Sequence, residues 1–429
     1  MEFIENTKEG ISDKKLNTFV VSITSKLKGV KKILVVHPDY TRVDFTDKIV
    51  PIVIQELRSG GAKKIDFLNA SGTHREMTDS EFCSKLGIEK KESYINFFNH
   101  HFSNPDNLIT IGNIKSSLVK EKTGGQLSQS IPVTVNKLIF NSYDLIIAIN
   151  GTVPHEASGY SGGLKIFFPG ISGPEVIDLF HWAAVLVGIP NIIGTVYNNA
   201  RDIINEGSIH ILRRLKTKIY SFDMVNIEKD NEVIPVGLYI DRGFEGFIRA
   251  YKLASLASSK VHVKYINRPL TQVVQVIPKY YDEIWTAGKG SYKLQKPGVM
   301  AKEGEIIIFA PHITCFHSKD DMDSDILKLG YHCKDSICHH LESDTKVCRN
   351  VAAHVINVAG TGVYNRDTKK EKLYFKVTLA TGISEEVCRS VGLGYRDPKS
   401  IKRKDFSGPG KLWIEDGGKY LYDLKNRRE

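Results

Sequence analysis

The sequence lacks several features that would place the protein in particular classes. It contains no run of about 18 apolar residues, so no membrane-spanning helix is expected. The N-terminus is polar and has no apolar core of the kind found in secretory signals. Six cysteines in 429 residues do not make a disulfide framework. These absences together predict a cytoplasmic protein.

The charge balance is basic, with a formal net charge of +10. Lysines and arginines are mixed with acids along the chain, and aromatic residues are not interleaved with them on a strand. We therefore expect a solvated basic surface that attracts small anions, with no nucleic-acid or membrane partner. The length is sufficient for two domains of ordinary size.

Helix and strand signals alternate through the first 265 residues. Apolar runs predict strands, and helical spacing with capping residues predicts helices. The expected strands cover residues 31–36, 64–68, 138–140 and 144–149, and the expected helices cover residues 45–58 and 78–85. This alternation predicts a doubly wound α/β domain with a parallel sheet.

Three loops follow strands of this predicted sheet, at residues 37–42, 69–75 and from 150 onward. In such sheets, ligands bind beyond the carboxyl ends of the strands. The side chains expected to converge at this edge are Asp39, Arg42, His74, Arg75, His155 and Lys165.

The third loop places His155, a glycine turn at Ser161–Gly163, Lys165 and His181 within 27 residues. The backbone N–H groups of the turn can hold an anion such as phosphate, and Lys165 adds a positive charge or a nucleophilic amine. A capping box at residues 172–175 is expected to open the helix that carries His181. Each feature alone is typical of a mobile loop, a solvated lysine or a packed histidine. Their combination indicates a cofactor site.

A second domain is expected to begin near Asn267 and Pro269, which gives domains 1–266 and 267–429. Residues 271–277 and 305–310 are its expected strands, and Lys289 lies between glycines at an expected helix. We predict a smaller α/β domain, with the active site in the cleft between the two domains.

Cysteines and histidines between Cys315 and His354 offer a competing, metal-binding interpretation. Four residues separate Cys333 from Cys338 and no second pair matches them, which is poor spacing for structural zinc. The acidic segment 320–325 lacks the glycine and terminal glutamate of a calcium loop. Thiols and histidines without a metal are the favoured interpretation.

The assembled motifs resemble those of the nickel-pincer lactate racemase family, which contains 2-hydroxy-acid racemases and epimerases. The family has an Asp-x-x-Arg loop, a Gly-Thr-His-Arg loop, a histidine, a Ser-Gly-Gly-x-Lys turn and a later histidine. Here these motifs are Asp39–Arg42, Gly72–Arg75, His155, Ser161–Lys165 and His181. Lys289 also falls where the family's second domain supplies a lysine, so the resemblance covers nearly the whole chain.

The resemblance implies a nickel-pincer nucleotide (nickel pyridinium-3,5-bisthiocarboxylic acid mononucleotide) bonded to Lys165 through a thioamide. His181 would ligate the nickel, whose other donors belong to the cofactor. The turn formed by Ser161, Gly162 and Gly163 would hold the phosphate, with Asp39 and Thr286 also at the cofactor. Separate maturation enzymes would assemble this group, so protein made in a host without them would lack it.

The resemblance also implies roles in the reaction. His74 and His155 would be paired general bases, one on each side of the substrate, and Arg42 and Lys289 would bind or polarise it. Hydride would pass from the carbinol carbon to the cofactor and back, so that a planar ketone can be reduced on either face.

Some positions depart from the family pattern. Val43 replaces a proline, Leu164 replaces an arginine in the turn, and Thr286 replaces a glutamine, while Trp285 and Trp413 both qualify as the family's second-domain tryptophan. The substrate can thus be a larger hydroxy acid, a diacid or a sugar acid rather than lactate. A nickel-pincer enzyme with net redox chemistry and a cofactor-free binding protein for an anionic metabolite remain alternatives. The sequence gives no indication of an oligomeric state.

Overall fold

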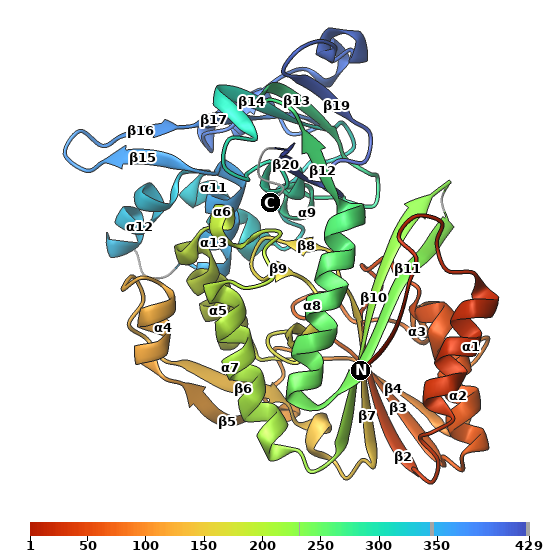
Figure 1. The fold of residues 1–429 in the computed structure, drawn as a ribbon. Helices are drawn as coiled ribbons and strands as arrows, with labels where there is room; N and C mark the ends of the chain where they lie inside the picture. Colours follow the sequence, from red (N-terminus) through yellow and green to blue (C-terminus); the bar gives the residue numbers. More distant parts are fainter. Residues whose placement is uncertain (231, 344–346, 426–429) are drawn as a thin grey trace. The chain divides into compact units, whose positions relative to one another are not determined.

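The computed structural model describes residues 1–230, 232–343 and 347–425 (Figure 1). The chain forms two compact units, each described by itself. Unit 1 comprises Met1–Phe180 and Thr195–Val261, and unit 2 comprises His181–Gly194 and His262–Glu429. Residues 181–194 therefore belong to unit 2 although segments of unit 1 flank them.

Unit 1 is built on a seven-stranded sheet with the strand order β1-β11-β10-β7-β2-β3-β4. Strands β10, β7, β2, β3 and β4 run parallel, and β11 and β1 join antiparallel at one edge. The strands are β1 (Glu2–Glu5), β2 (Lys32–His37), β3 (Lys64–Asn69), β4 (Ile95–Phe98), β7 (Leu145–Gly151), β10 (Lys218–Lys229) and β11 (Glu232–Arg242). The predicted parallel-sheet α/β fold is confirmed.

Helices and two small sheets complete unit 1. The helices are α1 (Asp13–Thr24), α2 (Thr46–Ser59), α3 (Asp79–Leu86), α4 (Ser116–Lys122), α7 (Asn199–Arg214) and α8 (Gly243–His262), with 3₁₀ turns η1 (Pro105–Asn107), η2 (Lys137–Phe140) and η3 (Gly163–Ile166). The small sheets pair β5 (Leu108–Ile114) with β6 (Ile131–Asn136) and β8 (Pro154–His155) with β9 (Gly159–Tyr160). Helix α5 (Pro174–Val187) begins in unit 1 and ends in unit 2.

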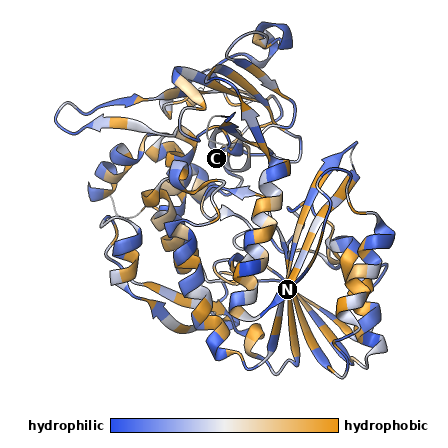
Figure 2. Cartoon of the chain, in the orientation of Figure 1, coloured by the Kyte–Doolittle hydropathy of each residue, from blue (hydrophilic) through white to orange (hydrophobic). Residues whose placement is uncertain are grey.

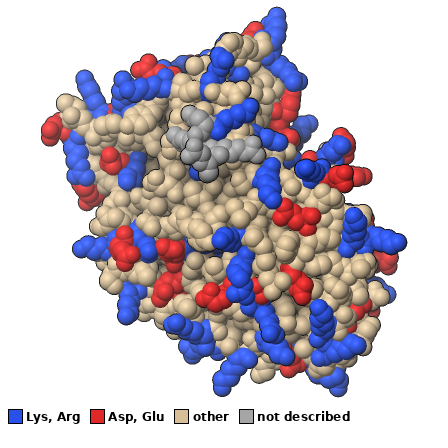
Figure 3. Space-filling view, viewed as in Figure 1, with Lys and Arg blue, Asp and Glu red and all other residues tan. Residues whose placement is uncertain are grey.

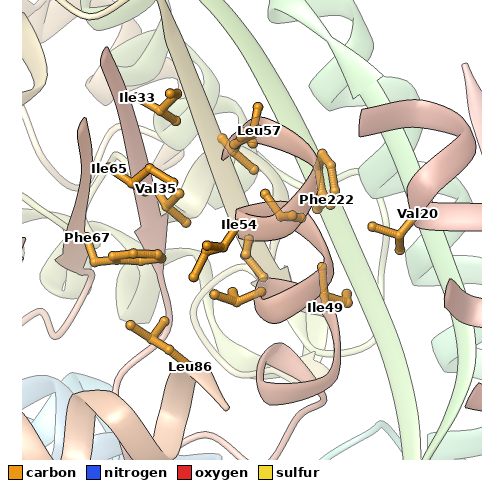
Figure 4. Close-up of a cluster of buried hydrophobic side chains, with 14 of the residues drawn as sticks. Val20, Ile33, Val35, Ile49, Ile54, Leu57, Ile65, Phe67, Leu86 and Phe222 are labelled. Carbon is orange, nitrogen blue, oxygen red and sulfur yellow. The ribbon is translucent and has the colours of Figure 1, made fainter. Parts of the chain in front are cut away.

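Helix α2 shows how sequence spacing builds the core. Ile49, Val53 and Leu57 recur at four-residue intervals, lie on one helix face and are buried. They pack with side chains of β2 and β3, such as Val35 and Ile65 (Figure 4). Fully burying one such side chain stabilises the fold by about 1.5–3 kcal/mol.

The opposite face of the sheet is covered by α8. Ala250, Ala254 and Ala257 form its contact with β10 and β11, against Val225 and Tyr239. Small alanine side chains let the helix approach the sheet closely. Helices therefore cover both faces, as a doubly wound domain requires.

Two local predictions were wrong. Residues 138–140 belong to the 3₁₀ turn η2 rather than to a strand, because the side chain of Asn136 accepts a bond from the Leu138 N–H and starts the turn. The capping box predicted at residues 172–175 does not match the start of α5, because the helix begins at Pro174 and Gly173, not Ser172, is the residue that precedes it, with its carbonyl accepting the Ile177 N–H. The capping box of α3, by contrast, is present at Thr78 and Glu81.

Unit 2 contains a five-stranded parallel sheet with the order β18-β17-β14-β13-β19. Its strands are β12 (Val263–Ile266), β13 (Leu270–Val276), β14 (Met300–Ala310), β15 (Gly362–Asn365), β16 (Lys370–Leu373), β17 (Phe375–Thr381), β18 (Gly394–Tyr395), β19 (Lys411–Ile414) and β20 (Leu421–Leu424). Its helices are α6 (Ile189–Ile192), α9 (Ile284–Ala287), α10 (Lys289–Tyr292), α11 (Asp320–Leu329), α12 (Lys334–Ser343), α13 (Arg349–Ala359) and α14 (Glu385–Ser390), with 3₁₀ turns η4 (Pro398–Ser400) and η5 (Arg403–Phe406).

The surface and the interior differ in composition as expected. Hydrophobic residues dominate the inner strands of unit 1 (Figure 2). On the face drawn in Figure 3, lysine and arginine side chains are distributed among acids rather than gathered in one patch. Within the described ranges, no helix is both long and apolar enough to cross a bilayer.

Candidate active site

Three strands of unit 1 bring the predicted loops to one edge of the sheet. Strand β2 lies between β3 and β7 and runs parallel to both, with Val36 level with Leu68 and Ala148. The loops that follow these strands therefore leave the sheet at the same edge, as the sequence predicted.

Asp39 and His74 form a hydrogen-bonded pair at this edge. The His74 Nδ1 lies 2.5 Å from Asp39 Oδ2, and the other carboxylate oxygen accepts bonds from the Thr41 N–H and hydroxyl at 3.0 and 2.6 Å. Burial raises the pKa of Asp39, but the bond from His74 and the charges of His74 and Arg42 outweigh it and lower that pKa well below its usual range. An ionised Asp39 can only accept, so the His74 proton sits on Nδ1 and Nε2 keeps its lone pair.

His155 is held in the opposite tautomer. Its Nδ1 accepts a bond from the Ala157 N–H at 3.1 Å, and an amide N–H can only donate. Glu156 also lies 3.5 Å from this nitrogen. With Nδ1 accepting this bond, the neutral form of the His155 ring carries its proton on Nε2, whereas the neutral form of the His74 ring has its lone pair on Nε2.

Lys165 lies in η3 and is partly buried. Burial lowers the pKa of its amine to about 8, and the charges of Arg42 and Arg201 act in the same direction while those of Glu156 and Asp39 oppose them. With this pKa, about a tenth of the amine is neutral and nucleophilic at pH 7, far more than for an ordinary lysine. Lys165 therefore lies within electrostatic range of Asp39 and Arg42.

The glycine turn before Lys165 does not present a free row of N–H groups. The Ser161 N–H donates to the Val153 carbonyl at 2.8 Å, and the Gly163 N–H donates to Asp223 at 2.7 Å. The predicted anion nest therefore needs correction at Ser161 and Gly163. A phosphate at this turn would depend on Gly162 and on nearby cations.

Close packing explains why glycine occupies two positions of this turn. Gly162 has φ +88°, and a Cβ there would lie 2.6 Å from the Thr152 hydroxyl. Gly163 has φ +57°, and a Cβ there would lie 2.9 Å from Tyr251. A side chain at either position would have to displace well-packed atoms.

Arg201, which the sequence did not single out, fixes the turn from α7. Its buried guanidinium donates to the carbonyls of Ser158 at 3.2 Å, Gly162 at 3.3 Å and Tyr160. The centroid of the Tyr251 ring lies 3.9 Å from the guanidinium carbon. No spacing rule in the sequence distinguishes this arginine from others on the same helix.

Asp223, in the middle of β10, was also missed. It accepts the Gly163 N–H and the Ser221 hydroxyl, the latter at 2.6 Å. Burial raises its pKa to about 6, although these two bonds act in the opposite direction. A carboxylate flanked by Phe222 and Met224 in a buried strand was the signal that could have identified it.

The two predicted arginines differ in whether their guanidinium groups are already paired with a carboxylate. Arg42 is exposed, and it is the Arg42 carbonyl, not the guanidinium, that accepts a bond from Lys85 at 2.7 Å. Arg75 forms a two-bond pair with Glu81 at 3.0 and 2.6 Å and stacks on Tyr40. Arg75 is therefore held against Glu81 of α3 and is not paired with the other side chains that were predicted to meet at the sheet edge.

Unit 2 holds the other predicted residues. The Lys289 Nζ lies 3.4 Å from the Tyr281 hydroxyl and 4.6 Å from its ring centroid. The Thr286 hydroxyl donates back to the Glu283 carbonyl at 3.0 Å. His181 is partly buried.

Trp285 and Trp413, both candidates for the family's tryptophan, lie in different surroundings. Trp285 stacks on His354 at 4.4 Å and contacts His317 edge-on at 5.0 Å. Trp413 packs between Phe309 and Phe406 in the hydrophobic core of unit 2. Trp285 also precedes Lys289 by four residues, which makes it the better candidate for a site residue.

The Cys/His segment 315–354 contains three residues, 344–346, that lie outside the described ranges. Among the residues that are described, no group of three or more His, Cys, Asp or Glu side chains is arranged to hold a metal ion. Burial lowers the pKa of His354 to about 3, with the charge of His317 adding to the effect. His354 is thus a neutral packed side chain.

Residues 13–189 match the sequence pattern of the lactate racemase N-terminal domain. The matched stretch is 177 of the 429 residues, less than half of the chain, and it resembles this domain. The stretch includes the predicted residues from Asp39 to His181, and it confirms the resemblance that the motifs indicated.

Two curated lactate racemases are similar to parts of the chain. The lactate racemase of Thermoanaerobacterium thermosaccharolyticum is 30% identical over 179 residues, which cover 41% of this chain and 38% of that protein. The lactate racemase of Lactiplantibacillus plantarum is 30% identical over 155 residues, which cover 36% of this chain and 33% of that protein. These matches span well under half of each relative.

Two solved structures resemble nearly the full chain. A crystal structure of a protein from Thermotoga maritima has a TM-score of 0.92 and 52% identity, and the match covers 98% of this chain and 100% of that one. The lactate racemase apoprotein of T. thermosaccharolyticum has a TM-score of 0.67 and 18% identity, and the match covers 96% and 93% of the two chains. The second likeness shows that the fold is that of lactate racemase.

Proposed function

We propose that the protein is a lactate-racemase-like isomerase that inverts the carbinol carbon of a 2-hydroxy acid. One observation carries the proposal: within the lactate racemase N-terminal domain, an Asp39–His74 pair and a Lys165 amine of lowered pKa lie at one sheet edge. A base and a tethering amine are the two parts that the chemistry of this family needs.

The residues present fit the cofactor that the family implies. The Lys165 amine, with its pKa of about 8, suits a thioamide bond to a carboxyl-derived group. Asn150, near the end of β7, and Thr152, just after it, are buried, and their Nδ2 and Oγ1 atoms have no hydrogen-bond partners among the described residues. Buried polar atoms of this kind are normally satisfied, and oxygen atoms of a bound nucleotide would satisfy them.

Lys165 would hold the nickel-pincer nucleotide covalently, with Asp39 and the Gly162 backbone beside it. His181 and Thr286 keep the roles that the family resemblance implies, nickel ligand and cofactor contact. Separate maturation enzymes would supply the group. When bound, the group supplies an electrophilic carbon that accepts a hydride and returns it.

His74 is arranged to take the hydroxyl proton of the substrate. Its Nε2 carries the lone pair because the Asp39 carboxylate holds the proton on Nδ1. A charged Asp39 also stabilises the imidazolium that forms when the proton arrives. His155 offers an Nε2–H that can hold the substrate oxygen, and it must release the Ala157 N–H to act as a base in turn.

Arg42 supplies the cation for the substrate carboxylate from the same edge, and Lys289 keeps its implied role in polarising the substrate. Because Thr286 replaces the family's glutamine, the accepted acid can be larger than lactate. The substrate class is therefore a 2-hydroxy acid, including hydroxy diacids and sugar acids.

The proposal is tested on protein co-produced with the maturation enzymes and incubated with single enantiomers of lactate, malate and longer 2-hydroxy acids. Chiral chromatography should show the opposite configuration at the carbinol carbon for at least one of them. Accumulation of the 2-keto acid instead would indicate net redox chemistry. Binding without inversion would indicate a binding protein.

A further inference from the structure

The segment that leads into Lys165 is held by groups outside it. Residues 158–163 contribute three carbonyls and two N–H groups to bonds with side chains of α7, β10 and α8. Arg201 donates to the three carbonyls, and Asp223 accepts the Gly163 N–H. The Tyr251 hydroxyl donates to the Ser158 carbonyl and accepts the Tyr160 N–H, both at 3.3 Å.

We propose that Arg201, Tyr251 and Asp223 form a positioning clamp that fixes the turn before Lys165 and presents the Lys165 amine for acylation. The inference rests on the proposed attachment of a cofactor at Lys165. None of the three side chains is proposed to touch the substrate, so each is a positioning residue.

The burial of Arg201 supports a positioning role over simple stabilisation. A buried charge is costly to desolvate, and neutral or apolar side chains often stabilise an interior better. Arg201 nevertheless stays buried, with a charge that acts on Lys165. A guanidinium has five N–H donors in a fixed planar arrangement, so it can hold three carbonyls at set angles, which an ammonium group cannot.

The clamp also keeps the amine reactive. Arg201 adds a positive charge near Lys165, and the fixed turn keeps Lys165 partly buried. Both effects favour the neutral amine. Removing Arg201 should weaken both effects, and each loss should raise the pKa of Lys165.

The experiment measures acetylation of Lys165 in the full, adduct-free chain with the N-hydroxysuccinimide ester of acetic acid. The neutral amine attacks the ester carbonyl, a C–N bond forms, N-hydroxysuccinimide leaves, and the amine loses its proton to solvent. Quantitative peptide mass spectrometry from pH 6.5 to 10.5 gives the pH midpoint of the reaction. We expect a wild-type midpoint close to the Lys165 pKa of about 8.

Arg201→Met should move this midpoint upward by roughly one unit or more, and Tyr251→Phe, which keeps the ring, should move it less. Arg213→Met is the matched control, since Arg213 is exposed on the same helix and should leave the midpoint unchanged. Arg201→Lys keeps the positive charge but lacks the planar donors. A midpoint between those of wild type and Arg201→Met would therefore show how much of the effect comes from the hydrogen-bond geometry and how much from the charge. Circular dichroism establishes that each variant is folded.

A folded Arg201→Met protein with the wild-type midpoint would overturn the clamp. Where that variant does not fold, an unshifted midpoint in Tyr251→Phe and Arg201→Lys overturns it equally, and a shift in either supports it. The result is independent of the proposed function: a Lys165 that never carries a nucleotide would contradict the function while leaving the midpoint shift intact.

Discussion

The His74 loop and the Lys165 turn leave the same edge of one sheet but are held in different ways. The His74 side chain is 35% exposed and depends on one carboxylate, Asp39. The Lys165 turn is packed beneath Arg201 and Tyr251, and its glycines have no room for a side chain. The difference suits their proposed tasks, because a base must reach and leave a substrate whereas a covalent tether must stay in place.

The largest effect is expected at the turn. Lys165→Ala should abolish both nickel retention and racemisation in co-produced protein, because the covalent attachment is lost. Metal analysis and chiral chromatography measure the two quantities. Wild-type nickel content and activity in this variant would contradict the proposed tether.

Changes in the His74 loop should lower racemisation without lowering nickel retention. His74→Ala should keep nickel but lower turnover by roughly 10²–10⁴-fold, the range of a general base. Asp39→Asn should act in the same direction, since an amide no longer holds the proton on Nδ1. The control is Arg75→Ala, because Arg75 pairs with Glu81 away from the converging set. Loss of nickel in His74→Ala would show that the loop also holds the cofactor.

Alanine at matched glycines should show the difference in packing. Gly163→Ala adds a Cβ that would lie 2.9 Å from Tyr251 at φ +57°, and we expect it to lower the free energy of unfolding by about 3 kcal/mol or more. Gly72 in the His74 loop has the same φ and nothing within 4 Å of an added Cβ. Gly72→Ala should therefore cost only about 1 kcal/mol. Equal losses in urea denaturation would contradict the contrast.

The two buried carboxylates should respond to pH in opposite ways. The Asp223 pKa of about 6 lies above the unfolded value of about 3.9, so its protonated form favours folding and stability falls as pH rises from about 4 through 6. Up to about 3 kcal/mol is involved. Asp39 has a lowered pKa, so its contribution is present above about pH 3.9 and is lost as the pH falls further.

Denaturation of wild type and Asp223→Asn at pH 4.5 and pH 7.5 isolates the Asp223 effect. The asparagine variant cannot titrate, so its stability relative to wild type should be greater at pH 7.5 than at pH 4.5. A constant difference between the two proteins would show that Asp223 has an ordinary pKa.

The smallest effect is expected at the surface of the His74 loop. Arg75→Ala removes a pair with Glu81 whose arginine side chain is 56% exposed. Exposed ion pairs contribute about 0–1 kcal/mol. The loss in unfolding free energy should stay within that range, and a loss of several kcal/mol would mean that Arg75 supports the loop.

Sequence reasoning predicted the fold well where one periodicity dominated. The apolar run of β7 and the four-residue spacing of Ile49, Val53 and Leu57 each allow a single interpretation. Residues 138–140 were misassigned because a three-residue apolar run is compatible with either a strand or a turn, and the side-chain bond from Asn136 decides. Local patterns cannot show such bonds in advance.

The site residues that directly follow strands could be predicted from the sequence. The residues that hold the site through contacts distant in the sequence could not. Asp39 and His74 could be placed together because β2 and β3 are parallel neighbours. Arg201 contacts carbonyls about forty residues earlier in the chain, so no local motif reveals it. The same tertiary contacts satisfy the N–H groups of Ser161 and Gly163, which the glycine pattern alone presented as free.

The most direct test of the account is the mass of the peptide that contains Lys165, from protein isolated from its native host or co-produced with the maturation enzymes. The account predicts a covalent nucleotide adduct on Lys165 together with nickel in the intact protein. An unmodified Lys165 in protein that racemises a 2-hydroxy acid would contradict it.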